Sequence, residues 1–306
     1  NKVAPFYYYP GWWEGGAELE FFINAKAYAA LPAEFQAIVD AAASTYNNAL
    51  GVISAYTGSN TAPTLQDYLN AEVAGVSSAE LAQLNTFIAQ LPSASTDSST
   101  EVQSVVTAFN ALLAAADSNL ATAASLSQSD FVTLGLTAIS GDEASLLNTV
   151  ISGLAPTTVD TWTELSTLAA QVGRVIGTAS SDSLSNAPSL TDLTALGVTG
   201  VTTANLAVVQ QAIASATTAQ VDTLSELQSV VTSAANAYTA ALGTISAYAQ
   251  NNGGTAPTTT TFAQAGVTGV DSGNMAAIQS ALTSSAITGT LADTTTEVQT
   301  VVDAFN

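Results

Sequence analysis

Apolar residues recur every three or four positions along most of this chain, a spacing that places them on one face of an α-helix. The clearest example is a stripe of nine residues that occurs twice, 192 positions apart. The first copy consists of Phe35, Ile38, Val39, Ala42, Tyr46, Ala49, Leu50, Ile53 and Tyr56, and the second of Leu227, Val230, Val231, Ala234, Tyr238, Ala241, Leu242, Ile245 and Tyr248. The pattern predicts two amphipathic helices, each of about 23 residues.

A six-residue box, Glu-x-Gln-x-(Val/Ile)-Val, opens each of these helices and recurs along the chain. Its glutamate stands at five places, the third of them in a degenerate copy, and successive glutamates are 67, 63, 62 and 71 residues apart: Glu34, Glu101, Glu164, Glu226 and Glu297. A recurring period of this size indicates a repeat architecture. Each period predicts a long helix, a short helix and a medium helix with apolar residues at i, i+3 and i+7.

We therefore expect a mainly α fold, built from tandem three-helix-bundle repeats of about 62–71 residues, with a short aromatic-rich β or loop segment at the N-terminus. The predicted organisation is an N-terminal segment, four repeats and the start of a fifth. Their bounds are 1–33, 34–100, 101–163, 164–225, 226–296 and 297–306.

Four of the five box glutamates follow the pattern Asp-(Ser/Thr)-x-x-Glu, which is the pattern of a helix capping box. In such a box the hydroxyl accepts the backbone N–H of the glutamate, and the carboxylate accepts the N–H of the cap residue. The residues to which we assign this structural role are Ser98, Glu101, Thr161, Glu164, Thr223, Glu226, Thr294 and Glu297. The glutamine of the box is expected to face water.

Composition excludes several kinds of function. The chain has no Cys and no His, and it has 24 acidic but only three basic residues. Without a histidine base we predict no catalytic residue, and without Cys, His or a calcium-loop motif we predict no metal site and no cofactor. So acidic a surface predicts no nucleic-acid binding, and no apolar run is long enough to insert into a membrane.

Residues 1–33 differ from the repeats. A Tyr-rich stretch leads to Pro10-Gly-Trp-Trp-Glu14, then to a predicted strand over 18–24 and a helix start at Leu31-Pro32. This order resembles the C-terminal half of the periplasmic solute-binding proteins of TRAP transporters, over residues 3–42. The resemblance implies that Trp13 and Glu14 help to hold a small organic acid. The alternative is that these aromatic residues only pack against the first repeat. A natural fusion, an engineered fusion and a mis-joined sequence all remain open as origins of this segment.

The repeats themselves resemble the helical modules of large secreted or surface-anchored bacterial adhesins, over residues 34–306. The shared feature is a Gly-Val-Thr-Gly-Val turn ahead of a helix, found at 197–201 and 266–270. The resemblance implies a structural region of a secreted or cell-surface protein, acting as a stalk, a spacer or an extracellular filament subunit in adhesion. Its partners would be neighbouring repeats, copies of itself or a surface or matrix protein. The alternative is part of a periplasmic receptor for a small organic acid.

Overall fold

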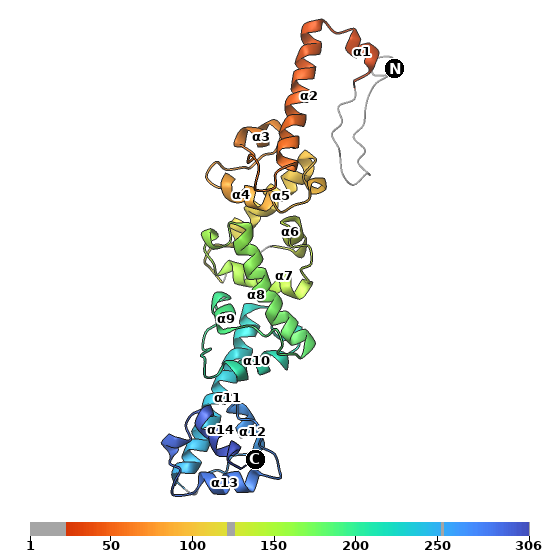
Figure 1. Ribbon diagram of the computed structural model, residues 1–306. Helices are drawn as coiled ribbons and strands as arrows, with labels where there is room; N and C mark the ends of the chain where they lie inside the picture. The colour runs from red at the N-terminus through yellow and green to blue at the C-terminus, as the bar shows by residue number, and fades with distance from the viewer. Residues whose placement is uncertain (1–22, 121–125, 252–253, 306) are drawn as a thin grey trace. The chain divides into compact units, whose positions relative to one another are not determined.

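The computed structural model describes residues 23–120, 126–251 and 254–305, and these residues are mainly helical, with no β-strand among them (Figure 1). The α-helices are α1 (Ala25–Ala29), α2 (Ala33–Ser54), α3 (Leu65–Asn70), α4 (Leu81–Ile88), α5 (Ser99–Ala115), α6 (Gln128–Thr133), α7 (Gly141–Ser152), α8 (Trp162–Ser181), α9 (Leu190–Ala195), α10 (Leu206–Ala214), α11 (Leu224–Asn251), α12 (Thr259–Gln264), α13 (Met275–Leu282) and α14 (Thr295–Asp303). Four 3-10 helices precede α5, α8, α11 and α14: η1 (Ser93–Ser95), η2 (Pro156–Thr158), η3 (Thr218–Gln220) and η4 (Gly289–Leu291).

These elements follow one recurring order: a long helix, a helix of six residues, a helix of eight to twelve residues and a 3-10 turn. The order runs α2-α3-α4-η1, α5-α6-α7-η2, α8-α9-α10-η3 and α11-α12-α13-η4. The described residues form two compact units, one of residues 23–120, 126–140 and 151–167, and one of residues 141–150, 168–251 and 254–305.

The four short helices end in the same way. At each end a backbone N–H reaches back five residues to a carbonyl, with N–O distances of 2.9 Å, as in a Schellman motif. The carbonyl belongs in each case to a large residue that is fully buried: Tyr68, Phe131, Leu193 and Phe262. The short helix therefore places one large apolar or aromatic side chain in the core and then turns sharply away.

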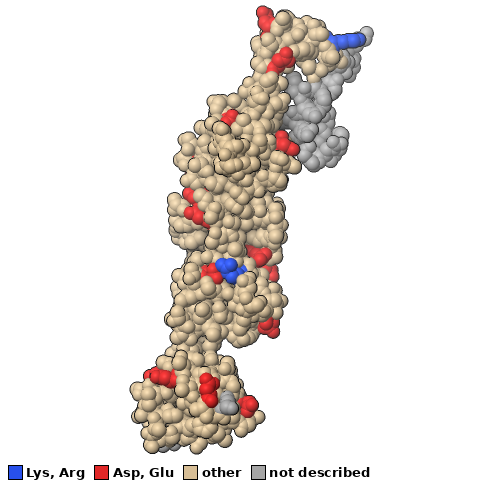
Figure 2. Space-filling model, in the orientation of Figure 1, with Lys and Arg blue, Asp and Glu red and all other residues tan. Residues whose placement is uncertain are grey.

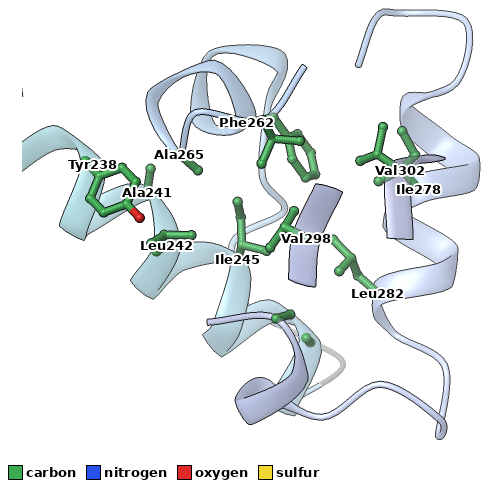
Figure 3. Close-up of a cluster of buried hydrophobic side chains, with 13 residues drawn as sticks. Tyr238, Ala241, Leu242, Ile245, Phe262, Ala265, Ile278, Leu282, Val298 and Val302 are labelled. Atoms are coloured by element: carbon green, nitrogen blue, oxygen red, sulfur yellow. The ribbon is translucent and has the colours of Figure 1, made fainter. Parts of the chain in front are cut away.

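Residues of four helices form the hydrophobic core of the last repeat, whereas the sequence predicts three (Figure 3). The second half of α11 contributes Leu242 and Ile245, and α12 contributes Phe262. The fourth helix is α14, which brings Val298 and Val302 into the same cluster. The first turns of one box helix thus complete the core of the preceding repeat.

In the unit formed by residues 23–120, 126–140 and 151–167, aromatic residues from three helices meet. Phe87 of α4 lies 5.4 Å from Phe109 of α5 and 6.4 Å from Trp162 of α8, measured between ring centroids, the second pair edge to face. Both distances lie in the favourable range for aromatic pairs. Trp162 is the residue directly after the cap Thr161, so the start of a box helix again packs on an earlier repeat.

The predicted N-terminal strand lies mostly outside the described residues. Its last residue, Asn24, has a helical role: its side-chain oxygen accepts the N–H groups of Lys26 and Ala27 at the start of α1. α1 then lies against α2, where the hydroxyl of Tyr28 donates to the Asp40 carboxylate at 2.6 Å.

Candidate functional site

The two residues singled out for ligand binding, Trp13 and Glu14, lie outside the residues that the structure describes. The eight residues assigned to helix capping are described, and they lie at the starts of α5, α8, α11 and α14.

At each of these four starts the structure places the hydroxyl and the box glutamate within reciprocal reach. In α5 the Ser98 hydroxyl accepts the backbone N–H of Glu101 at 3.3 Å, and the Glu101 carboxylate accepts the N–H of Ser98 at 3.1 Å. Thr161 and Glu164 make the same pair of bonds, as do Thr294 and Glu297. In α11 the Glu226 N–H donates to the Thr223 hydroxyl at 3.3 Å, and that hydroxyl donates to the Glu226 carboxylate at 2.7 Å.

The aspartate before the cap shares this site with the glutamate. Burial, followed by interaction with Glu164, raises the pKa of Asp160. Burial and a hydrogen bond with Glu226 likewise raise the pKa of Asp222, whereas the bond from the Thr223 hydroxyl lowers the pKa of Glu226. At the start of α11 the cap donors thus favour the ionised form of Glu226, whereas Asp222 is disfavoured as an anion.

The box glutamine clamps the turn of the preceding repeat. Gln103 accepts the backbone N–H of Ala74 at 2.8 Å and donates to the carbonyl of the same residue at 3.1 Å. Gln228 holds Thr199 in the same way, at 2.8 and 3.1 Å, and Gln299 holds Thr268, at 2.9 and 3.1 Å. The glutamine was expected to face water; its side chain is half-exposed, but its amide also pairs with a backbone as a neighbouring β-strand would.

A glycine with positive φ follows the clamped residue in all three cases, a conformation that residues with a Cβ adopt only at a cost. These are Gly75 at 81°, Gly200 at 83° and Gly269 at 77°. The degenerate box has Ser166 in place of the glutamine, and its hydroxyl bonds to Thr163 of its own helix. In the corresponding turn Ala138 stands in place of the glycine. The clamp and its glycine are therefore present together or replaced together.

That pairing was the signal in the sequence for the clamp. Glutamine and clamped residue are separated by 29, 29 and 31 positions. A recurrent glutamine at a nearly constant distance from a recurrent glycine turn indicates a side chain that bonds to the turn. Sequence reasoning that assigned each motif to its own repeat missed this bond because it crosses the repeat boundary.

A second recurrent amide holds the segment that leads into the short helix. Asn85, Gln210 and Gln279, at the same position of α4, α10 and α13, each donate to a proline carbonyl at 2.8 to 2.9 Å. The acceptors are Pro63, Pro188 and Pro257. Asn85 also accepts the hydroxyl of buried Tyr68, at 2.7 Å. Each of these repeats therefore fixes its loop with an amide rather than with a charge.

Charge is sparse on the described surface, and what there is is mostly acidic (Figure 2). Arg174 makes a two-pronged ion pair with Asp192, at 3.0 Å from Nε and 2.6 Å from a terminal nitrogen. Burial opposes ionisation of Asp192, but the bonds from Arg174 and Ser189 outweigh it and lower the pKa of Asp192. The side chain of Arg174 is therefore held by Asp192 within the fold.

A surface groove of about 520 Å³ lies along α5, within the unit that holds α3 and α6. Its walls carry the carboxylates of Glu72 and Asp130 and several hydroxyls of α5. Over the described ranges no three acidic residues gather as metal ligands would, and no helix there is long and apolar enough to cross a membrane. Eight of the nine residues that line the groove are polar, whereas small-molecule sites are lined mostly by apolar side chains.

Comparison with known proteins shows similarity over a short stretch of the chain. The chain is 55% identical over 38 residues to the monocarboxylate 2-oxoacid-binding periplasmic protein of Nostoc sp. (strain PCC 7120). The match covers 12% of this chain and 10% of that protein, so the chain spans about a tenth of its relative's length. No family model matches the chain, and no solved structure matches it.

Proposed function

We propose that residues 34–306 form a non-enzymatic structural array of tandem helical bundles, which spaces or displays other parts of a secreted or cell-surface bacterial protein. The observation that carries this proposal is the glutamine clamp at three repeat boundaries, at Gln103, Gln228 and Gln299. Each clamp ties the start of one long helix to the turn of the preceding repeat. A binding protein would instead concentrate its distinctive side chains at one place.

The way the last core is closed supports the same proposal. α14 supplies Val298 and Val302 to a core otherwise built by α11, α12 and α13. A repeat whose core needs the next helix folds as one link of a series, and repeats added to the series bury further surface without new kinds of contact. Such an array tolerates changes in repeat number, as a spacer requires.

The surface chemistry agrees with a place outside the cytoplasm and with a structural role. Charged residues make up 9% of the chain and only three are basic, so Ser, Thr, Asn and Gln cover most of the exterior. With no His or Cys, the chain lacks the commonest catalytic base and the thiol nucleophile. We propose adhesion or assembly at the cell surface, with copies of itself or a surface or matrix protein as partner.

Removing or adding one repeat in register tests the spacer function. Deleting residues 164–225 joins Thr163 directly to Glu226, and duplicating the same residues adds one repeat at the same boundary. Small-angle scattering on these two variants and the 306-residue chain should show the maximum particle dimension changing by equal steps. Unchanged dimensions across the three chains would contradict a spacer.

A second function is favoured by the 38-residue match to a protein named as 2-oxoacid-binding. In this alternative the N-terminal segment belongs to a periplasmic receptor of the TRAP type, with Trp13 and Glu14 near the ligand. Calorimetric titration of the 306-residue chain with pyruvate tests it, with Glu14→Gln as the matched variant. Heat that disappears in Glu14→Gln would favour the receptor, and a titration without heat would remove it for this chain.

A further inference from the structure

The first half of α2 carries an apolar stripe that lies open to solvent. Phe35 is 51% exposed and Ile38 is 62% exposed, whereas Ile53, in the second half of the same helix, is fully buried. α1 bonds to α2 at Asp40, which lies roughly 140° around the helix from Phe35 at 3.6 residues per turn.

The box position of Phe35 is fully buried in each later box, whereas that of Ile38 is half-buried in α11 and α14, at Val230 and Val301. Phe35 and Val39 correspond to Leu227 and Val231 in α11, and both of the latter are fully buried. In α14 the corresponding pair is Val298 and Val302, which complete the core of α11, α12 and α13. The exposed stripe of α2 therefore matches the surface with which α14 closes a core, but among the described residues no such core covers it.

We propose that this stripe docks on the last core of a second copy of the chain, in the place that α14 occupies there. The two copies then join head to tail, and the same contact can repeat from copy to copy. This deepens the proposed structural function by specifying how a filament would form.

The match between α2 and α14 identifies this occupant. Both helices begin with the box, so Gln36 stands where Gln299 clamps Thr268, and Glu34 stands where Glu297 is already accommodated. Gln36 itself has one bond, a donation to the Leu31 carbonyl at 2.8 Å, which the clamp would replace. Docking thus exchanges one helix for another that offers the same groups.

Single cysteines test the contact, because the chain has none of its own. A chain with Gln36→Cys is mixed with a chain of different tag length that carries Thr268→Cys, under mild oxidation. We expect a disulfide between the two different chains. The double variant Thr268→Cys with Gln299→Cys is the matched control, since its disulfide within one chain shows that the clamp geometry permits the bond.

A further substitution separates exchange from random collision. Val302→Ala in the Thr268→Cys chain weakens its own α14 and should raise the yield of the mixed disulfide by roughly tenfold. Phe35→Glu with Ile38→Glu in the Gln36→Cys chain changes only exposed positions and should abolish the mixed disulfide.

Disulfides between two Gln36→Cys chains in place of mixed ones would overturn the proposal and indicate pairing of two α2 helices. Absence of any disulfide, or a yield unchanged by Val302→Ala, would overturn it as well. Either result leaves the spacer test by repeat number unaffected, so failure of the docking and failure of the spacer function are distinguishable.

Discussion

The first halves of α2 and α11 carry the same stripe of side chains in different surroundings. Leu227 is fully buried in α11, whereas its counterpart Phe35 is 51% exposed in α2. The second halves of the two helices do not differ in this way, since Ile53 and Ile245 are both fully buried. An amphipathic pattern therefore states that a face is suited to burial, and the preceding repeat decides whether it is buried.

The comparison extends to the polar groups of the box. In α11 the glutamine pairs twice with Thr199 and the glutamate meets a hydroxyl cap, Thr223. In α2 the N-cap is Pro32, which has no side-chain hydrogen bond, and Gln36 bonds only within its own segment, to Leu31. In α2 the equivalent glutamine is thus present but bonded elsewhere, and the equivalent hydroxyl cap is replaced by Pro32.

Truncation of the paired apolar residues should give the largest difference in the free energy of unfolding between the two helices. Leu227→Ala should lower the free energy of unfolding by about 2–5 kcal/mol because it leaves a cavity in a closed core. Phe35→Ala should change it by no more than about 0.5 kcal/mol, because the side chain is largely exposed. Urea denaturation at low protein concentration measures both.

Ile53→Ala and Ile245→Ala serve as the matched controls, because these two residues are equally buried. Their costs should be similar to each other and close to that of Leu227→Ala. If Phe35→Ala cost as much as Leu227→Ala, the exposed stripe would already have a core within the monomer.

Helix positions and repeat order were predictable from the sequence because they depend on local pattern. The stripe that includes Leu242 and Ile245, the proline ahead of each short helix and the Asp-(Ser/Thr)-x-x-Glu pattern all act within one or two turns. A fold that is mainly helical follows from these, and the structure confirms it.

What the sequence could not show was which repeat each side chain serves. Val298 begins the fifth period in sequence, yet it lies in the core of the fourth repeat. Gln299 likewise bonds to Thr268, 31 residues earlier. A period fixes the spacing of residues but not their pairing across the boundary, so three helices were expected where four close the last core.

The glutamine clamp gives the next largest difference. Gln228→Leu removes two hydrogen bonds to the Thr199 backbone and should cost about 1–2 kcal/mol, whereas Gln36→Leu removes a single bond, to the Leu31 carbonyl, and should cost about 0.5 kcal/mol. Ser166→Gln is the control, since Ala138 replaces the turn glycine there and no stabilisation is expected. Thermal unfolding of the three variants measures this, and equal losses for the two glutamines would contradict the clamp.

The cap should give a smaller difference. Thr223→Ala removes the acceptor for the Glu226 N–H and should cost about 1 kcal/mol, while Thr223→Ser keeps the hydroxyl and should restore most of that loss. Pro32→Ala in α2 removes no side-chain hydrogen bond and should change stability by about 0.5 kcal/mol or less. Equal stabilities for the Ala and Ser variants at position 223 would show that the hydroxyl does not contribute.

The smallest expected difference is a dependence on pH at the start of α11 that the start of α2 lacks, because Ala30 precedes α2 where Asp222 precedes α11. Burial, followed by the hydrogen bond and the charge of Glu226, raises the pKa of Asp222 above its ordinary 3.8. The folded protein therefore binds this proton more tightly than the unfolded chain does, and ionisation of Asp222 destabilises the fold above that raised pKa. Asp222→Asn should accordingly be more stable than the parent chain at pH 7, and the difference should shrink as the pH falls toward 3.8. Thermal unfolding at a series of pH values between those limits measures it. A difference that grew toward low pH would show that the Asp222 carboxylate stabilises the helix start instead.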